Sequence, residues 1–179
     1  MNDKVKTFIR NISKETLQSY GKIEQVELSD LEPEKIRRDW LSMILINGDS
    51  IKISFKVFFS EQDVIPLITK KIGPNKPAGD FRGSFMNEYS NVAAGRIRHD
   101  LLTNGYDTKI SLPLHTKVLH GIEFFKQEET VMKDVWLCSW GTDESIICSS
   151  TLKVFDPGFD KKFEIPEEES KSSGAIELL

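Results

Sequence analysis

Residues 83–107 read GSFMNEYSNVAAGRIRHDLLTNGYD and contain the clearest helical period of the chain. At about 100° per residue, four apolar side chains fall on one narrow side of a helix: Met86, Ala93, Ile97 and Leu101. Asn104-Gly105 supplies a stop signal. The spacing predicts a long amphipathic helix over residues 81–104, with this apolar side facing the core.

The opposite side of the same helix carries an acid and an amide. Glu88 and Asn91 lie three residues apart, so they are neighbours on the helix surface. Ser84 and Gly95 lie along the same line, one turn before and one turn after the pair. Most charged side chains on helix surfaces have no specific role, so solvation alone would account for the pair unless its setting indicates a site.

Outward from this helix, hydrophobic periodicity predicts a leading helix over residues 4–20, ended by Gly21. Five segments are typical of strands because they are rich in Ile, Val and other strand-forming residues: 40–46, 51–59, 108–120, 132–140 and 145–155. Asn47-Gly48 predicts a hairpin between the first two. Ser60 then opens a shorter helix, which Pro66 either kinks or restricts to a start near Ile65.

The strands are consecutive rather than strictly alternating with helices. The sequence therefore predicts an α+β fold, in which a mixed or antiparallel β-sheet is covered by long helices.

Composition sets the broad class. The chain has 179 residues, 39% hydrophobic and 29% charged, which is typical of one globular domain. The start is too charged for a secretory signal and no apolar run is long enough to span a membrane, so we expect a cytoplasmic protein without a membrane partner. The chain has no basic stripe, and we therefore expect no nucleic-acid partner.

The negative charge is concentrated at the C-terminal end. Residues 156–179 hold seven acids and three lysines, which accounts for the whole formal charge of −4. The apolar pattern also weakens after Pro157. We therefore predict a single domain over residues 1–155 and an acidic, partly disordered tail over residues 156–179.

The residues that most often bind metals show no metal-ligand spacing. Cys138 and Cys148 lie in strand-like segments, which favours buried reduced thiols over a disulfide in a cytosolic protein. His99, His115 and His120 are scattered. We expect no metal site in this chain.

The long helix resembles the signature of the CheC/CheX family of chemotaxis phosphatases. That signature is Asp or Ser, three residues, Glu, two residues, Asn and, farther along, a proline. Ser84, Glu88 and Asn91 stand in register with it, VAAG follows, and Pro113 comes after 21 intervening residues, one fewer than usual. The order of elements over residues 4–155 is also similar to that family.

The resemblance implies a CheC/CheX-like fold and a phosphatase that hydrolyses the aspartyl phosphate of a CheY-like response regulator. The phosphorylated regulator would bring its own Mg²⁺ and lysine, and this chain would bind no cofactor. Asn91 would position the attacking water, because an amide accepts from water and donates to a phosphoryl oxygen without repelling the anion. Glu88 would pair with the regulator's lysine.

The neighbours of the pair would form the contact with the regulator. Ser84 and Gly95 would let the partner's backbone approach closely. Phe85 and Val92, which border the pair, would seal the contact, although Phe85 fits the core equally well.

Some members of that family carry the motif a second time, in the first helix. Here that helix offers Glu15 and Gln18, with Asn11 in place of the Asp or Ser. Glutamine is one methylene longer than asparagine and would misplace a water by about an ångström, enough to cost a large factor in rate. We interpret this helix as structural, which makes the chain closer to the single-site CheX type and implies a homodimer by resemblance only.

Two other interpretations remain open. A divergent member could keep the docking face and act as a non-catalytic binding module or regulator in a two-component or chemotaxis pathway. An unrelated hydrolase could instead use acids outside the long helix, with Asp134, Asp143 and Glu144 as candidates. Loop acids of this kind more often form turns.

Overall fold

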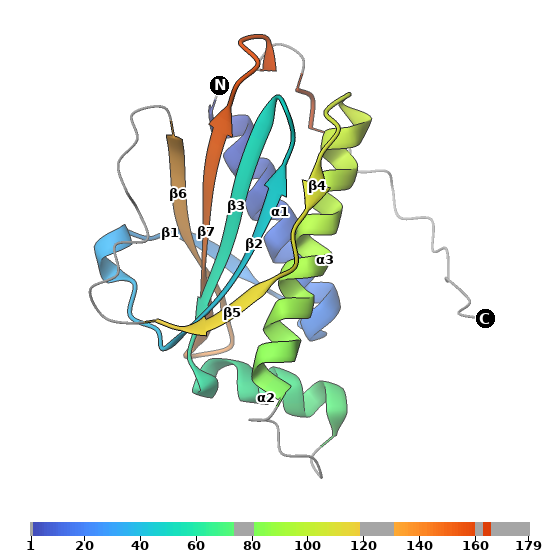
Figure 1. Cartoon of the computed structure of the whole chain (residues 1–179). Helices are drawn as coiled ribbons and strands as arrows, with labels where there is room; N and C mark the ends of the chain where they lie inside the picture. The colour runs from blue at the N-terminus through green and yellow to red at the C-terminus, as the bar shows by residue number, and fades with distance from the viewer. Residues whose placement is uncertain (1, 74–80, 119–130, 160–162, 166–179) are drawn as a thin grey trace, which may run out of the picture.

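The computed structural model describes residues 2–73, 81–118, 131–159 and 163–165 (Figure 1). The helices are α1 (Asn2–Gly21), η1 (Pro33–Lys35, a 3-10 turn), α2 (Glu61–Ile72) and α3 (Arg82–Thr103). The strands are β1 (Glu27–Asp30), β2 (Trp40–Asn47), β3 (Ile51–Phe59), β4 (Lys109–Ile110), β5 (Leu114–Lys117), β6 (Val131–Trp140) and β7 (Glu144–Val154). In the described ranges, no helix is both long and apolar enough to cross a membrane.

The seven strands of the described residues form one antiparallel sheet, in the order β1-β6-β7-β3-β2-β4. β4 and β5 pair with the same edge of β2. β4 pairs with the end of β2, at Ile46 and Asn47, and β5 pairs with its first half, from Trp40 to Met43. The predicted α+β class and antiparallel sheet are confirmed. The predicted hairpin β2–β3 is also present, and β6 and β7 form a second hairpin.

One predicted strand was drawn too long. The segment 108–120 is two short strands, β4 and β5, separated by residues 111–113, and residues 119–120 lie outside the described part. Pro113 has no N–H to donate to the ladder, so the strand is interrupted there. Ser111 covers the interruption: its N–H donates to the Leu45 carbonyl oxygen (2.8 Å), and its hydroxyl accepts from the Leu45 N–H (3.0 Å).

The short helix α2 begins at Glu61, so the alternative start near Ile65 is wrong. Ser60 caps it as predicted, and its N–H donates to the Asp63 carboxylate at 3.3 Å. Pro66 lies inside the helix, which continues to Ile72. The buried Val64, Leu67 and Ile68 on the inner side of α2 hold it against the core.

α1 and α3 pack side by side on one face of the sheet, and α2 closes one end (Figure 1). Alternate side chains of the strands face these helices and are almost fully buried, including Ile44, Phe55, Trp136 and Cys148. A smaller apolar cluster covers the other face of the sheet, with Leu41, Phe58, Val135 and Ile147 at its centre. The helix-covered face is the main core.

The core extends past the sequence boundary at residue 155. Phe159 and Phe163 are buried, with the Phe159 ring 4.7 Å from that of Tyr106 and the Phe163 ring 5.3 Å from that of Phe8. The first part of the segment assigned to the tail therefore packs on the domain. Residues 166–179, which carry the rest of the predicted tail, lie outside the described residues.

The hairpin between β2 and β3 touches the chain that follows α3. A Cβ at Gly48 would lie 2.5 Å from the backbone oxygen of Asp107, so only glycine fits this approach. The Asn47-Gly48 turn thus joins the hairpin to the start of β4, beside the C-terminal end of α3.

Candidate functional site

The outer side of α3 carries the four positions of the predicted site. Ser84, Glu88, Asn91 and Gly95 are all exposed, and no heavy atom lies within 4 Å of a Cβ built at Gly95. The opposite side, with Met86, Ala93, Ile97 and Leu101, is fully buried. The exposure that the site hypothesis requires is therefore present, and the roles of these residues stay predictions.

Polar contacts fix the rotation of α3 about its axis. The Ser42 hydroxyl of β2 donates to the Asn87 side-chain oxygen (2.9 Å) and lies 3.0 Å from the Ser90 hydroxyl oxygen. On the buried side, the Tyr89 hydroxyl donates to the Ser13 carbonyl oxygen of α1 (3.0 Å). These bonds sit on either side of Glu88 and hold the pair Glu88 and Asn91 outward.

Phe85 does not border the pair as an exposed side chain. It is only 5% exposed, and its ring centroid lies 4.9 Å from that of Tyr20 on α1. Of the two alternatives for Phe85, the core position is the one found, and a position on the exposed border of the pair is wrong. Val92 is half-buried. The apolar border of the pair is smaller than the sequence predicts.

An open groove of about 330 Å³ lies beside Glu88. Side chains from α1, α2, α3 and the residue that precedes α3 line it: Tyr20, Ile68, Lys71, Ile72, Phe81, Ser84, Phe85 and Glu88. The Lys71 Nζ lies 3.2 Å from the centroid of the Tyr20 ring and 5.7 Å from that of Phe85. An ammonium at that distance over an aromatic face is held by the ring's electrostatic field.

The groove is electrostatically coupled to Glu88. Burial raises the pKa of Tyr20, and the negative charge of Glu88 raises it further. Burial lowers the pKa of Lys71, while Glu88 opposes that change and Lys22 adds to it. Sequence reasoning missed Tyr20 and Lys71, because they reach the groove from α1 and α2 and no local spacing relates them to Glu88.

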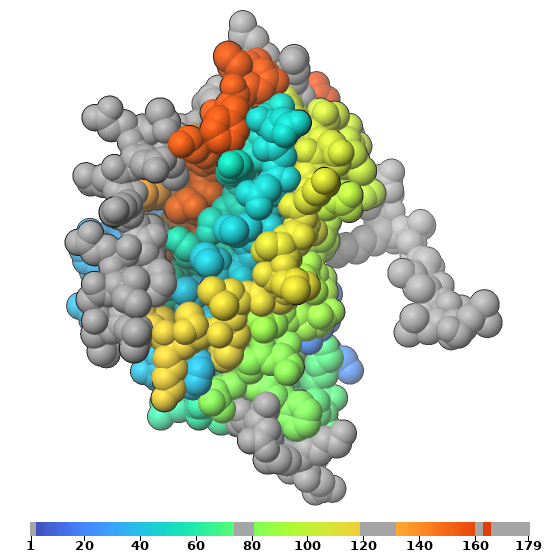
Figure 2. All heavy atoms as spheres, in the orientation of Figure 1, coloured from blue at the N-terminus to red at the C-terminus, as the bar shows by residue number. Residues whose placement is uncertain are grey.

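The other flank of α3 is an apolar edge. β4 and β5 run beside the helix (Figures 1 and 2), and the segment between them contains Pro113. Leu112 is 90% exposed and Leu114 is 52% exposed. The site-bearing helix thus lies between a groove with a cationic rim and an exposed apolar edge.

The look-alike pair on α1 is engaged within the fold. Glu15 forms an ion pair with Arg96 of α3, and the same guanidinium donates to the Thr16 hydroxyl at 3.2 Å. The Gln18 side-chain amide donates to the Glu24 carbonyl oxygen at 2.9 Å. These contacts tie α1 to α3 and to the following turn, which agrees with a structural role for this helix.

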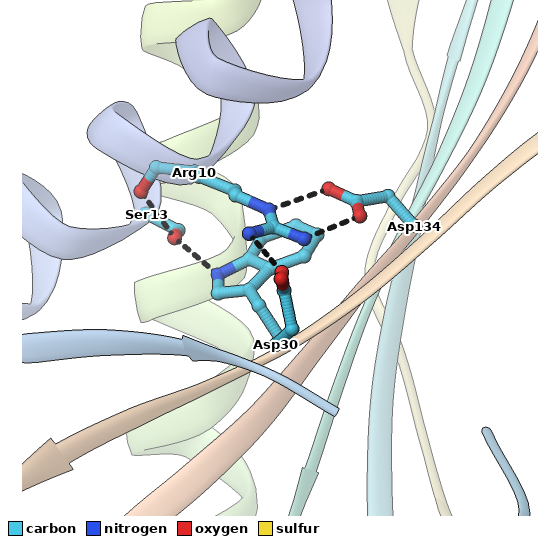
Figure 3. Close-up of polar contacts among 5 residues, drawn as sticks. Arg10, Ser13, Asp30 and Asp134 are labelled. Carbon is cyan, nitrogen blue, oxygen red and sulfur yellow. Dashed lines mark hydrogen bonds and ion pairs between the residues drawn. The ribbon is translucent and has the colours of Figure 1, made fainter. Parts of the chain in front are cut away.

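The acids proposed for an unrelated hydrolase are not brought together. Asp134 is buried and receives two hydrogen bonds from Arg10, at 2.8 and 2.6 Å (Figure 3). Asp134 of β6 lies opposite Ser150, whereas Glu144 of β7 lies opposite Trp140. Trp140 is six residues beyond Asp134 along β6. That separation is about 20 Å at the rise of a β-strand. These acids form no joint site.

The two thiols and His115 pack within the fold, and His120 lies outside the described residues. Cys138 and Cys148 are buried and free, with their sulfur atoms 3.9 Å apart, as predicted for reduced thiols. The His115 ring stacks on Trp40, with centroids 4.9 Å apart. In the described part of the chain, no three His, Cys, Asp or Glu side chains gather as metal ligands.

Comparison with known proteins places the fold. No protein-family model and no curated protein matches the sequence. Solved structures do match, among them the CheX–CheY–BeF₃–Mg²⁺ complex from Borrelia burgdorferi, at a TM-score of 0.69 and 12% identity, covering 82% of this chain and 96% of that one.

Two CheC-like structures are similarly close. One, from Shewanella sp. PV-4, has a TM-score of 0.64 and 16% identity, over 86% of this chain and 99% of the other. The second, from Shewanella oneidensis MR-1, has a TM-score of 0.65 and 13% identity, over 86% of this chain and all of the other. The chain has the fold of the CheC and CheX chemotaxis proteins.

Proposed function

We propose that this protein is a phosphatase that hydrolyses the aspartyl phosphate of a CheY-like response regulator. The observation that carries the proposal is the exposure of Glu88 and Asn91 on one line of α3, with small residues on either side at Ser84 and Gly95. The fold is similar to that of CheX from Borrelia burgdorferi, which was crystallised in a complex with CheY, BeF₃ and Mg²⁺, and this similarity supports a CheY-like partner.

The chemistry needs little from this chain. An acyl phosphate is already activated, and the Mg²⁺ carried by the regulator offsets the charge that develops on the phosphoryl oxygens. What the phosphatase adds is a water held in line with phosphorus. Asn91 does this by accepting a hydrogen bond from the water while its N–H₂ group donates to a phosphoryl oxygen.

Glu88 anchors the docked complex. Its carboxylate pairs with the lysine of the regulator, one helical turn from the water that Asn91 holds. The open space at Gly95 and the short side chain of Ser84 allow the partner's backbone to come close to α3. Helix α3 does not need to move, because its contacts with Ser42 and Ser13 already hold the pair outward.

The test is phosphate release from each phosphorylated regulator of the organism that encodes this chain, with Mg²⁺ present. We expect the wild-type protein to accelerate release from at least one regulator, and Glu88→Ala to require a higher protein concentration for the same rate. Folded wild-type protein that accelerates release from none of them would contradict the phosphatase proposal and leave a binding module.

A further inference from the structure

Three lysines gather where α1 and α2 end, and one of them, Lys71, lines the groove beside Glu88. Lys70 and Lys71 lie in the last turn of α2, and Lys22 follows the end of α1. The Lys70 ammonium donates to the Lys22 carbonyl oxygen and so joins the two helix ends. Lys22 is close enough to Lys71 to lower the pKa of Lys71. The three side chains are exposed.

Folding alone gives only part of the reason for this cluster. The α2 macrodipole favours cations in its last turn, which accounts for Lys70 and Lys71. It does not account for Lys22, which adds a like charge. Lys22 also adopts a left-handed backbone (φ 53°), a conformation that is strained for a non-glycine residue. A glycine there would relieve both the strain and the repulsion.

We infer that Lys22, Lys70 and Lys71 form a cationic entrance that draws the acidic face of a phosphorylated receiver domain onto α3, with Lys71 contacting a carboxylate of the regulator beside Glu88. This inference rests on the proposed function. A site that holds Mg²⁺ and a phosphoryl group is built from carboxylates, and its surface is therefore negative. Glu88 alone would repel it, and the three lysines reverse the sign of the charge at this corner.

Lys71 is placed to make the contact. The Tyr20 ring lies 3.2 Å from its Nζ and limits where the ammonium can point, and both side chains line the groove that Glu88 borders. A partner carboxylate entering the groove would meet Lys71, and a partner lysine would meet Glu88. The pair of opposite charges thus fixes the orientation of the docked regulator, and the surrounding lysines act on its rate of encounter.

The experiment measures association of the regulator, loaded with BeF₃ and Mg²⁺, by stopped flow at several salt concentrations. Lys71→Met keeps the length and loses the charge, and Lys71→Arg keeps the charge. The matched control is Lys52→Met, because Lys52 also lies over an aromatic ring, with its Nζ 5.5 Å from the Phe155 centroid. Lys52 is the second residue of β3, and α2, which carries Lys71, follows the opposite end of that strand (Figure 1).

We expect Lys71→Met to slow association about three- to tenfold at low salt and to flatten its salt dependence, since rim charges act mainly on association. Lys71→Arg and Lys52→Met should stay within about twofold of the wild type. If Lys71→Met associates with the regulator as fast as the wild type does, the inference is wrong. Faster association would also overturn it, and would show that Lys71 competes with the partner's lysine for Glu88.

The two proposals fail in different ways. If the wild type binds and dephosphorylates a regulator and Lys71→Met behaves as the wild type does, the phosphatase proposal stands and the cationic entrance is wrong. A wild-type protein that neither binds nor dephosphorylates any regulator removes both.

Discussion

Loss of the carboxylate at Asp134 should weaken the fold strongly, because it leaves Arg10 without its buried partner. The guanidinium donates to both Asp134 oxygens, at 2.8 and 2.6 Å, and to the Asp30 carboxylate at 2.6 Å (Figure 3). Asp134 has a side-chain exposure of 7%, against 86% for Asp30. The bond to Asp134 therefore carries most of the energy, and it joins α1 to β6.

The structure sets the magnitude. Removing one partner of a buried ion pair costs about 3–5 kcal/mol. Arg10 is itself 22% exposed and keeps Asp30, so Asp134→Ala should fall at the lower end, at about 3 kcal/mol. In a domain of this size that free energy corresponds to a Tm lowered by about 6–12 °C. Asp30→Ala removes an exposed partner and should cost about 0–1 kcal/mol.

The assay is urea and thermal unfolding of wild type, Asp134→Ala and Asp30→Ala. A double variant, Arg10→Met with Asp134→Leu, should recover most of the lost free energy of unfolding, because no buried charge is then left without a partner and the exposed Asp30 carboxylate stays solvated. An Asp134→Ala variant within about 1 kcal/mol of the wild type, or an Asp30→Ala variant as destabilised as Asp134→Ala, would show that the buried Arg10–Asp134 pair is not what stabilises this part of the fold.

Two further predictions concern the N-terminal end of α3 and the His115 ring of β5. Phe85→Ala should lower the free energy of unfolding by about 3–4 kcal/mol, since the ring is buried against Tyr20. The control is Phe81→Ala, which should lower it by under about 1 kcal/mol because Phe81 is 38% exposed. Thermal unfolding of both variants tests this difference. Burial, reinforced by Arg82, lowers the pKa of His115. As pH falls through about 6.5, the unfolded chain takes up a proton before the folded protein does, so the stability from neutral His115 is present above that pH and lost below it. His115→Phe keeps a ring on Trp40 but has no group that titrates in this range. Measured by urea unfolding, its free energy of unfolding should fall less between about pH 7.5 and about pH 5 than that of the wild type. An equal fall in both proteins would exclude His115 as the cause.

The long helix could be predicted because its period is strong and its two sides differ in chemistry. Met86, Ala93, Ile97 and Leu101 recur at helical spacing, and the same geometry places Glu88 and Asn91 outward. The order of the strands could not be read from the sequence. β7 lies between β6 and β3, and that placement depends on contacts between distant segments.

The misses have physical reasons. β1 reads ELSD, a mostly polar edge strand in which only Leu28 is apolar, so no alternation marks it. Phe85 was ambiguous because its angle on the helix lies between the two sides, and Tyr20, which buries it, comes from α1. The groove and its lysines depend on three helix ends that meet only in the folded chain.

The most direct test of the central claim separates docking from chemistry at Asn91. With a regulator that the wild type dephosphorylates, two quantities are measured for wild type and Asn91→Ala: the rate of phosphate loss at saturating phosphatase, and the Kd for the regulator loaded with BeF₃ and Mg²⁺. We expect Asn91→Ala to lower the saturated rate by about a hundredfold or more and to change the Kd by less than about threefold. A saturated rate that survives the substitution would contradict the role of Asn91 in holding the water.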